Sequence, residues 1–264
     1  MLIEEVTKRL APQAAAPDCN TVDRLEAGDL SAEVKGIAVS FMASHQVIDR
    51  AAALGANLLI AHEGLFYSHR HHQGDPIGRD PVVLQKKRRL EELGLAVYRC
   101  HDGIHRERPD GITAGLIEAV GWESYVLDHR SATALLEIPP MTLGDIAALW
   151  KRKLDLPFVR VVGDPAMLCR KAGVLAGYRG GGELAIPLLG DEGADLIIAG
   201  EGPEWETPEY VRDAAYQGRN QALIVLGHGP SEIPGMKRLA YRLQADYPGI
   251  PVFFIADEPL FQLI

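Results

Sequence analysis

Residues 55–64 read GANLLIAHEG, and residues 193–202 read GADLIIAGEG. Seven of the ten positions are identical, and each segment is a short apolar run bounded by turn signals, which is typical of a buried strand. One position changes its chemistry, because His62 of the first copy corresponds to Gly200 of the second. The repetition indicates an internal duplication, and the exchange raises the question of why only one copy carries a histidine.

Strands alternate with helices on both sides of each decapeptide, which predicts an α/β fold with largely parallel sheets. We predict two similar α/β lobes, residues 1–127 and 128–264, with no inserted domain. The expected strands are 36–41, 56–61, 95–100, 159–163, 172–178, 194–199, 222–227 and 252–256. The expected helices are 1–10, 45–54, 82–93, 112–120, 143–154, 183–192, 208–217 and 235–246, and residues 11–34, 64–80 and 228–232 are expected to be irregular.

The composition excludes several classes of protein. Hydrophobic content of 47% and charged content of 24% are those of a soluble globular protein. A net charge of −9 argues against nucleic acid as a partner, because phosphate contacts need a basic surface. The sequence has no apolar run of the ~20 residues that a membrane helix requires, no signal peptide, and three widely spaced cysteines. We expect a cytoplasmic protein without a membrane partner.

Side chains that can bind metal ions follow three of the expected strands in pairs. The pairs are His62 with Glu63, His101 with His105, and His228 with Glu232. In VYRCHDGIH (97–105) and IVLGHGPSE (224–232), a strand runs into a histidine, three further residues and a second ligand-type residue. Because ligands bind at the carboxyl ends of strands in open α/β sheets, these side chains are expected at one edge of the architecture.

A single histidine is more often an ordinary surface or core imidazole than a metal ligand, but three pairs at corresponding positions of a repeat favour a metal site. Imidazole and carboxylate suit zinc, iron and manganese, and two ions could be held if a carboxylate bridges them. The histidine-rich stretch HRHH (69–72) lies in a polar loop outside the repeat. It is interpreted as a solvated loop at the mouth of the site.

These motifs resemble those of the Nif-three-like proteins, also called GTP cyclohydrolase 1 type 2 homologues, over nearly the whole chain. GANLLIAHEGLF (55–66) resembles the strand that leads into their His-His-Pro motif, and VYRCHDGIH resembles their His-Thr-Asn-Leu-Asp motif. GADLIIAGEG resembles their Thr-Gly-Asp/Glu strand, and GHGPSE (227–232) resembles their Gly-His-x-x-x-Glu motif.

The resemblance implies two α/β lobes around a dinuclear metal site between them, and a ring-shaped homohexamer. Carried over by position, the implied ligands are His62, Glu63, His105, His228 and Glu232, with Glu232 as the bridge between two divalent ions. Glu63 stands where the family has histidine, and His105 stands where it has aspartate. Together the two exchanges keep three imidazoles and two carboxylates, and we interpret them as compensating each other.

The sequence therefore favours a metal-dependent hydrolase acting on a small nucleotide-like or phosphorylated substrate. Glu201 is expected to be a general base or to hold a metal ligand in place, and His101 is expected to hold a ligand rather than to bind the metal. The first decapeptide gives its histidine to the metals, whereas Gly200 is interpreted as leaving room for water or substrate. The alternatives are a metal-stabilised regulatory or scaffold protein without turnover and a structural duplication that binds nothing.

Overall fold

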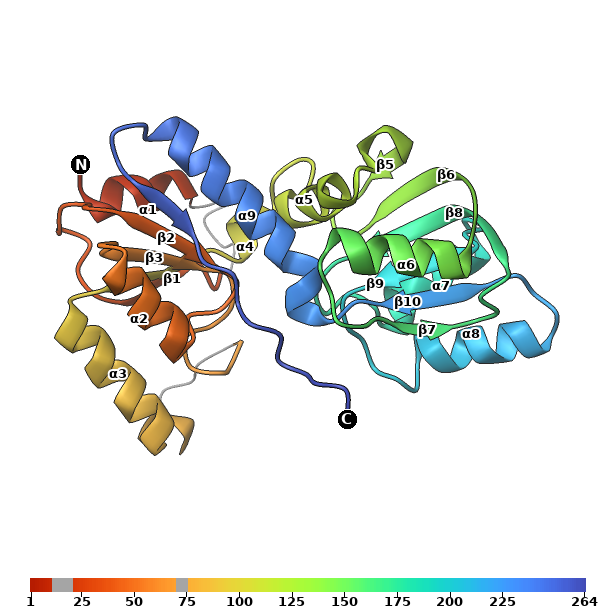
Figure 1. The fold of residues 1–264 in the computed structure, drawn as a ribbon, viewed down its shortest axis with the longest axis horizontal. Helices are drawn as coiled ribbons and strands as arrows, with labels where there is room; N and C mark the ends of the chain where they lie inside the picture. Colours follow the sequence, from red (N-terminus) through yellow and green to blue (C-terminus); the bar gives the residue numbers. More distant parts are fainter. Residues whose placement is uncertain (11–20, 70–75) are drawn as a thin grey trace. The chain divides into compact units, whose positions relative to one another are not determined.

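The computed structural model describes residues 1–10, 21–69 and 76–264, and it divides into two compact units (Figure 1). Unit 1 comprises Met1–Glu107 and Met236–Glu258, and unit 2 comprises Arg108–Gly235 and Pro259–Ile264. This division differs from the predicted boundary between residues 127 and 128. Residues 108–127 belong to unit 2. The segment Met236–Glu258 belongs to unit 1 because the last strand, β11 (Val252–Phe254), pairs in parallel with β2 (Ile37–Ser40), which satisfies the backbone groups along that side of β2.

The described residues of unit 1 form a five-stranded sheet in the order β1-β4-β3-β2-β11, in which β1 is antiparallel to its neighbour and the other described strands are parallel. Figure 1 shows α2 and α3 on one side of this sheet and α1 and α9 on the other. The central strands β2, β3 and β4 are buried along their whole length. The elements are α1 (Ile3–Leu10), β1 (Arg24–Ala27), β2, α2 (His45–Ala53), β3 (Leu58–Ala61), the 3₁₀ turn η1 (Pro76–Arg79), α3 (Pro81–Leu93), β4 (Ala96–Arg99), α4 (Asp102–His105) and β11.

Unit 2 is a six-stranded mixed sheet in the order β5-β6-β8-β9-β10-β7, with β8, β9 and β10 parallel. Helices α7 and α8 pack on a core of buried aliphatic side chains from these strands. The elements are α5 (Gly111–Val120), the 3₁₀ turn η2 (Glu123–Tyr125), β5 (Val126–His129), β6 (Ala134–Thr142), α6 (Leu143–Lys153), β7 (Arg160–Val162), β8 (Leu168–Leu175), α7 (Gly182–Gly190), β9 (Leu196–Ala199), α8 (Thr207–Tyr216) and β10 (Ala222–Val225). Helix α9 (His228–Asp246) begins in unit 2 and ends in unit 1.

The predicted duplication is confirmed by the topology of the two sheets. In unit 1 an antiparallel strand is followed across the sheet by three parallel strands in the order β1-β4-β3-β2, and unit 2 repeats the pattern as β7-β10-β9-β8. The two decapeptides supply the equivalent central strands β3 and β9, and each of these is buried throughout. Their short apolar runs therefore occupy the position in which a strand is covered on both faces.

Several segments differ from the sequence prediction, among them β1 and η1, which lie within stretches expected to be irregular. Residues 228–232 were expected to form a turn before a helix beginning at residue 235, but they are the first residues of α9. Pro230 is accepted there because the first backbone N–H groups of a helix have no partner within the helix. Strands β5 and β6 were not predicted, since Pro139 and Pro140 interrupt the strand pattern, and the β6–β8 register is indeed irregular between Glu137 and Met141.

The helices of the described residues include none that is both long enough and apolar enough to cross a membrane.

Candidate metal centre

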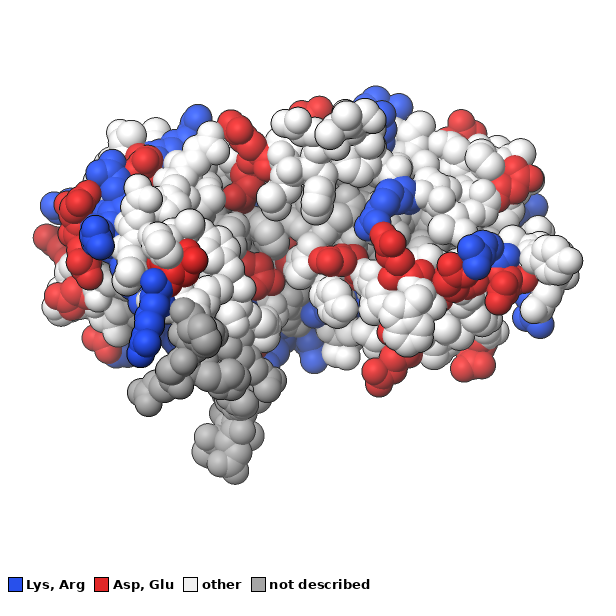
Figure 2. Space-filling model, turned by 90° about the horizontal axis from the view of Figure 1, so that it is seen from below, with Lys and Arg blue, Asp and Glu red and all other residues white. Residues whose placement is uncertain are grey.

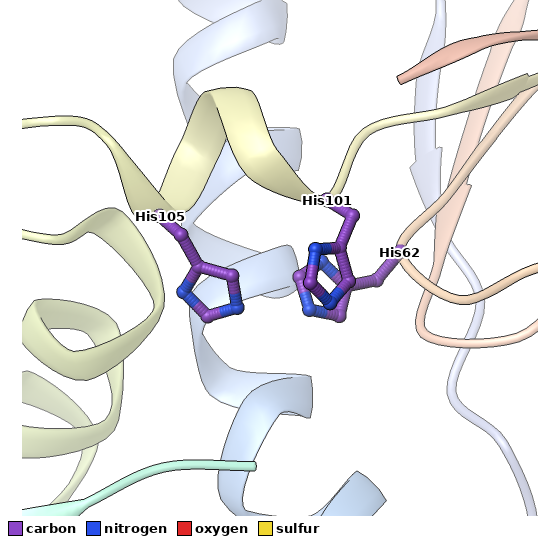
Figure 3. Close-up of side chains that lie close together, drawn as sticks. All are labelled: His62, His101 and His105. Carbon is purple, nitrogen blue, oxygen red and sulfur yellow. The ribbon is translucent and has the colours of Figure 1, made fainter. Parts of the chain in front are cut away.

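Three histidine rings of unit 1 lie against one another (Figure 3). The ring centroids of His62 and His101 are 4.6 Å apart in a stacked arrangement, and His105 lies edge-on at 5.0 Å from each of them. One nitrogen from each ring lies within 4.8 Å of the other two. A zinc ion sits about 2.1 Å from each histidine nitrogen that binds it, so ligands must be close neighbours of this kind. The three imidazoles are a candidate site for a divalent ion.

The local structure explains how these histidines meet. His62 directly follows β3, and its backbone N–H donates to the Phe41 carbonyl at 3.0 Å. His101 immediately precedes α4, and His105 is the last residue of that helix. Residues four apart lie on one face of a helix, so the one-turn helix α4 directs both rings toward the end of β3.

The hydrogen bonding of His62 leaves its other nitrogen oriented for a metal. The residue is fully buried, and Nδ1 lies 3.0 Å from the backbone carbonyl oxygen of Cys100. A carbonyl can only accept, so Nδ1 carries the hydrogen and the lone pair is on Nε2. Metal-binding histidines commonly donate their second nitrogen to a carbonyl in this way. The Cys100 thiol itself is buried, which raises its pKa and makes it a poor nucleophile.

His101 is held in its neutral form. Burial, followed by the neighbouring rings of His62 and His105, lowers the pKa of His101 to about 4. Its Nδ1 lies 3.0 Å from Asp102 Oδ1, which accepts the ring hydrogen. Burial acts to raise the pKa of Asp102, but hydrogen bonds from the Val22 N–H and from His101 hold that pKa at about 2. A neutral ring beside a permanent carboxylate can offer its remaining nitrogen to a cation.

Asp23 fixes the start of α4 from a distant part of the chain. Its Oδ1 accepts from the backbone N–H groups of His101 at 2.8 Å and Asp102 at 2.7 Å, and its Oδ2 accepts from Gly103 at 2.7 Å. These are the groups at a helix start that lack partners within the helix. Asp23 therefore orients the turn that carries both His101 and His105.

A second cluster in unit 1 combines Glu63, His69 and His101. Glu63 Oε1 lies 3.8 Å from His101 Nε2, and the rings of His69 and His101 are 4.9 Å apart. Glu63 Oε2 accepts from the guanidinium of Arg99 at 3.1 Å. The carboxylate of Glu63 thus lies between an arginine and the histidine cluster.

Unit 2 contains a cluster of its own at the strand ends that correspond to those of unit 1. His228 Nδ1 lies 3.0 Å from Glu201 Oε2, and His228 Nε2 lies 3.3 Å from Glu232 Oε2. Glu232 is buried and stands four residues after His228, on the same face of α9. The contact of Glu201 with Nδ1 supports the view that it holds His228 in place.

Two glycines are required by the close packing around this second cluster. Gly177 has φ +66°, and a Cβ there would lie 2.1 Å from Glu232 Oε1. A Cβ at Gly200 would lie 2.3 Å from Ser231 Oγ and 2.6 Å from the Gly177 carbonyl oxygen. The space beside Gly200 was interpreted as room for water or substrate, but it is filled by Ser231 and the backbone of Gly177. The second decapeptide lacks a histidine because no side chain fits there.

The predicted site residues fall into two groups. The structure brings His62 and His105 together and places His101 beside them. That His101 holds a ligand rather than binding the metal stays a prediction. Glu63 lies at the edge of this group. His228, Glu232 and Glu201 form the group in unit 2. That the ligands of both units share one dinuclear site stays a prediction.

Sequence reasoning did not identify Asp23, Arg99 or His69 as parts of the site. Asp23 lies in the stretch 11–34, where no periodic pattern draws attention to it. His69 belongs to the stretch 69–72, whose density of histidines was a signal, but it was interpreted as a solvated loop. His69 is exposed yet contacts His101, whereas His71 and His72 lie outside the described residues.

The duplicated sheets and the imidazole and carboxylate clusters at their strand ends define a two-unit α/β protein with candidate metal-binding groups. The chain belongs to the Duf34/NIF3 (NGG1p interacting factor 3) family, whose profile matches residues 2–259. This confirms the resemblance inferred from the motifs.

Curated relatives and solved structures agree with this assignment. The chain is 27% identical to the GTP cyclohydrolase 1 type 2 homolog of Deinococcus radiodurans over 233 residues, which cover 84% of this chain and 80% of the relative. It is 23% identical to the protein of the same name from Clostridium acetobutylicum, covering 90% and 87%. The fold is similar to that of Staphylococcus aureus protein SA1388, with a TM-score of 0.76, 19% identity and coverage of 100% and 99%. Thermus thermophilus TTHA1606 is also similar, with a TM-score of 0.73, 20% identity and coverage of 99% and 100%.

Proposed function

We propose that the chain is a metal-dependent hydrolase that acts on a small nucleotide-like or phosphorylated substrate. The observation that supports this proposal most strongly is the cluster of His62, His101 and His105. Its rings are mutually adjacent, the second nitrogens of His62 and His101 are bound to a carbonyl and a carboxylate, and burial keeps His101 neutral. These are the properties that divalent-metal ligands need.

A divalent ion at such a site supplies Lewis acidity and lowers the pKa of bound water to about 7. The residues of the chain prepare the site for that chemistry. His62, His101 and His105 provide the nitrogen ligands, and Glu63 Oε1, 3.8 Å from His101 Nε2, provides a nearby oxygen. Cys100, through its carbonyl oxygen, and Asp102 keep the rings in the tautomers that bind metal.

The second of the two proposed ions uses ligands of unit 2. His228 and Glu232 are its protein ligands, and Glu201 accepts the Nδ1 hydrogen of His228 and so directs Nε2 toward Glu232. Glu201 is about half exposed, with a side chain 46% accessible, so water can reach its carboxylate, as a role as general base would require. In this proposal its main role is to hold His228.

General chemistry and the names of the relatives support the proposed substrate class. Divalent ions bind phosphate oxygens, and the relatives are named as homologues of a GTP cyclohydrolase. The net charge of −9 disfavours nucleic acid as a partner, and acidic and basic side chains of the described residues are interspersed on the face shown in Figure 2. We therefore favour a small molecule. A homohexamer, which the family resemblance implies, completes the proposal.

The proposal is tested on tag-free protein by metal analysis and by an activity screen. We expect about two equivalents of zinc, iron or manganese per chain, and we expect His101→Asn and His228→Ala each to lower the metal content. His129→Asn is a matched control because His129 is an exposed residue of β5. Phosphate esters, nucleotides and cyclic amides are then screened with each metal.

The outcomes separate the alternatives. Turnover that is lost in His101→Asn and kept in His129→Asn supports the hydrolase. Bound metal that raises thermal stability, without turnover of any compound, supports a metal-stabilised regulatory or scaffold protein. If no reconstitution loads the chain with metal, the proposal is wrong.

A further inference from the structure

Arg99 is the last residue of β4, and it carries a buried positive charge. The residue is 1% exposed, although arginine is rarely buried unless its charge is compensated. Its guanidinium donates to the backbone carbonyl oxygens of His69 at 2.8 Å and His62 at 3.4 Å, and to Glu63 Oε2 at 3.1 Å. Among the described residues, the carboxylate that neutralises this charge is that of Glu63, at the edge of the candidate metal site.

The guanidinium also fixes the state of the His69 ring. Arg99 Nη2 lies 3.1 Å from His69 Nδ1. A guanidinium has only N–H donors and no lone pair to offer, so Nδ1 of His69 must accept. The hydrogen of a neutral His69 ring is then on Nε2. While this bond persists, the Nδ1 lone pair is directed at Arg99 and not at a metal.

Glu63 and His69 are two of the three members of the second cluster of unit 1, which His101 completes. Both are already in contact with one cation, at 3.1 Å in each case. A guanidinium that binds a carboxylate oxygen and an imidazole lone pair makes the contacts that a metal ion would make there. It also repels any further cation at close range.

We propose that Arg99 is an internal cation that takes the place of a metal ion in the cluster of Glu63, His69 and His101. Unit 1 then binds one ion, through His62, His101 and His105, and the inference rests on the proposed function for that ion. It also gives a reason for the carboxylate at position 63, where the family resemblance leads one to expect histidine. Glu63 Oε2 neutralises Arg99, while Oε1 faces His101.

The first test uses variants that leave Arg99 in place. Metal-free protein is titrated with Zn²⁺ or Mn²⁺ by calorimetry. His69→Asn is expected to change the dissociation constant by less than about threefold, whereas His101→Asn weakens binding by about tenfold or more, as loss of a ligand or its support does. If His69→Asn weakens binding as much as His101→Asn does, His69 is a metal ligand and the inference is wrong.

The second test removes the internal cation. Arg99→Met frees Glu63 and His69, and we expect the titration to show one more equivalent of metal per chain than in the wild type. Arg99→Lys keeps a positive charge and is expected to keep the wild-type count, and Arg99→Met with His69→Asn is expected to return to it. An unchanged count in a folded Arg99→Met protein contradicts the inference, and if that variant does not fold, the His69→Asn result decides. If the wild type binds no metal, the proposed function is wrong. The number of metal equivalents bound by Arg99→Met would then decide this inference on its own.

Discussion

Removing the Asp23 carboxylate is expected to weaken metal binding from outside the candidate metal centre. In Asp23→Ala the N–H groups of His101, Asp102 and Gly103 lose an acceptor that lies 2.7–2.8 Å away. Losing a helix-capping side chain costs about 0.5–2 kcal/mol. We expect the upper end of that range, about 2 kcal/mol, because one carboxylate serves three donors. Since His101 precedes α4 and His105 ends it, two of the three histidines depend on this turn. We therefore also expect metal affinity to fall by about 10–100-fold, as for other residues that orient metal ligands.

The assay separates stability from positioning by means of a matched capping residue. Asp80 caps α3 in the same unit, where its Oδ1 accepts from the Val82 N–H at 2.8 Å. Both Asp23→Ala and Asp80→Ala are expected to lower the free energy of unfolding in urea, but only Asp23→Ala should weaken Zn²⁺ binding by calorimetry. Asp23→Asn, which keeps one acceptor oxygen, should recover part of the affinity. Equal losses of affinity in the two alanine variants, or no loss in Asp23→Ala, would refute the reasoning.

Three further predictions follow from the packing of individual residues. Gly177→Ala should displace the Glu232 carboxylate, because its Cβ would lie 2.1 Å from Oε1. Metal analysis should then show less bound metal per chain, whereas the control Gly190→Ala, at an open position, should leave the metal content unchanged. Gly200→His, which restores the histidine of the first decapeptide, should lower the free energy of unfolding measured in urea, because unit 2 has no space for the side chain. A variant as stable as the wild type would show that the space is not filled as described. Burial lowers the pKa of Lys86 from 10.5 to about 8, so the unfolded chain binds more protons between these pH values. The difference in free energy of unfolding between the wild type and Lys86→Met should therefore rise by about 3 kcal/mol from pH 8 to 10.5. If this difference does not change with pH, burial does not lower the pKa of Lys86.

The central strands could be predicted from the sequence because short apolar runs such as LLIA (58–61) and LIIA (196–199) are favourable only when they are buried. Helix starts were also predictable where a side chain bonds its own backbone. Ser44 accepts from the Val47 N–H, and Thr142 accepts from the Asp145 N–H, at the starts of the predicted helices 45–54 and 143–154. These signals are local, so a single sequence contains them in full.

The parts that were missed depend on contacts between distant segments. β11 belongs with β2 although the paired residues Phe254 and Val39 lie 215 positions apart, and no local pattern assigns β11 to unit 1. The capping of α4 by Asp23 bridges 78–80 positions of the chain. In the sequence, nothing distinguishes Arg99 from other residues of a strand, whereas the fold shows that its charge is buried against Glu63.

The histidine that distinguishes the two decapeptides now has a structural explanation on both sides. His62 is buried with its Nδ1 bonded to Cys100, which directs Nε2 as a ligand. Gly200 has no space for a side chain, because Ser231 and Gly177 pack against it. The duplication therefore preserved the strand and changed the chemistry at its end.

The central claim is that His62, His101 and His105 hold a divalent ion. Crystals of the chain grown with Zn²⁺ or Mn²⁺ test it directly through an anomalous difference map recorded at the absorption edge of the metal. The account predicts a peak about 2.0–2.2 Å from a nitrogen of each of the three rings. Metal-loaded crystals in which the three rings are ordered and no anomalous peak lies among them would contradict it.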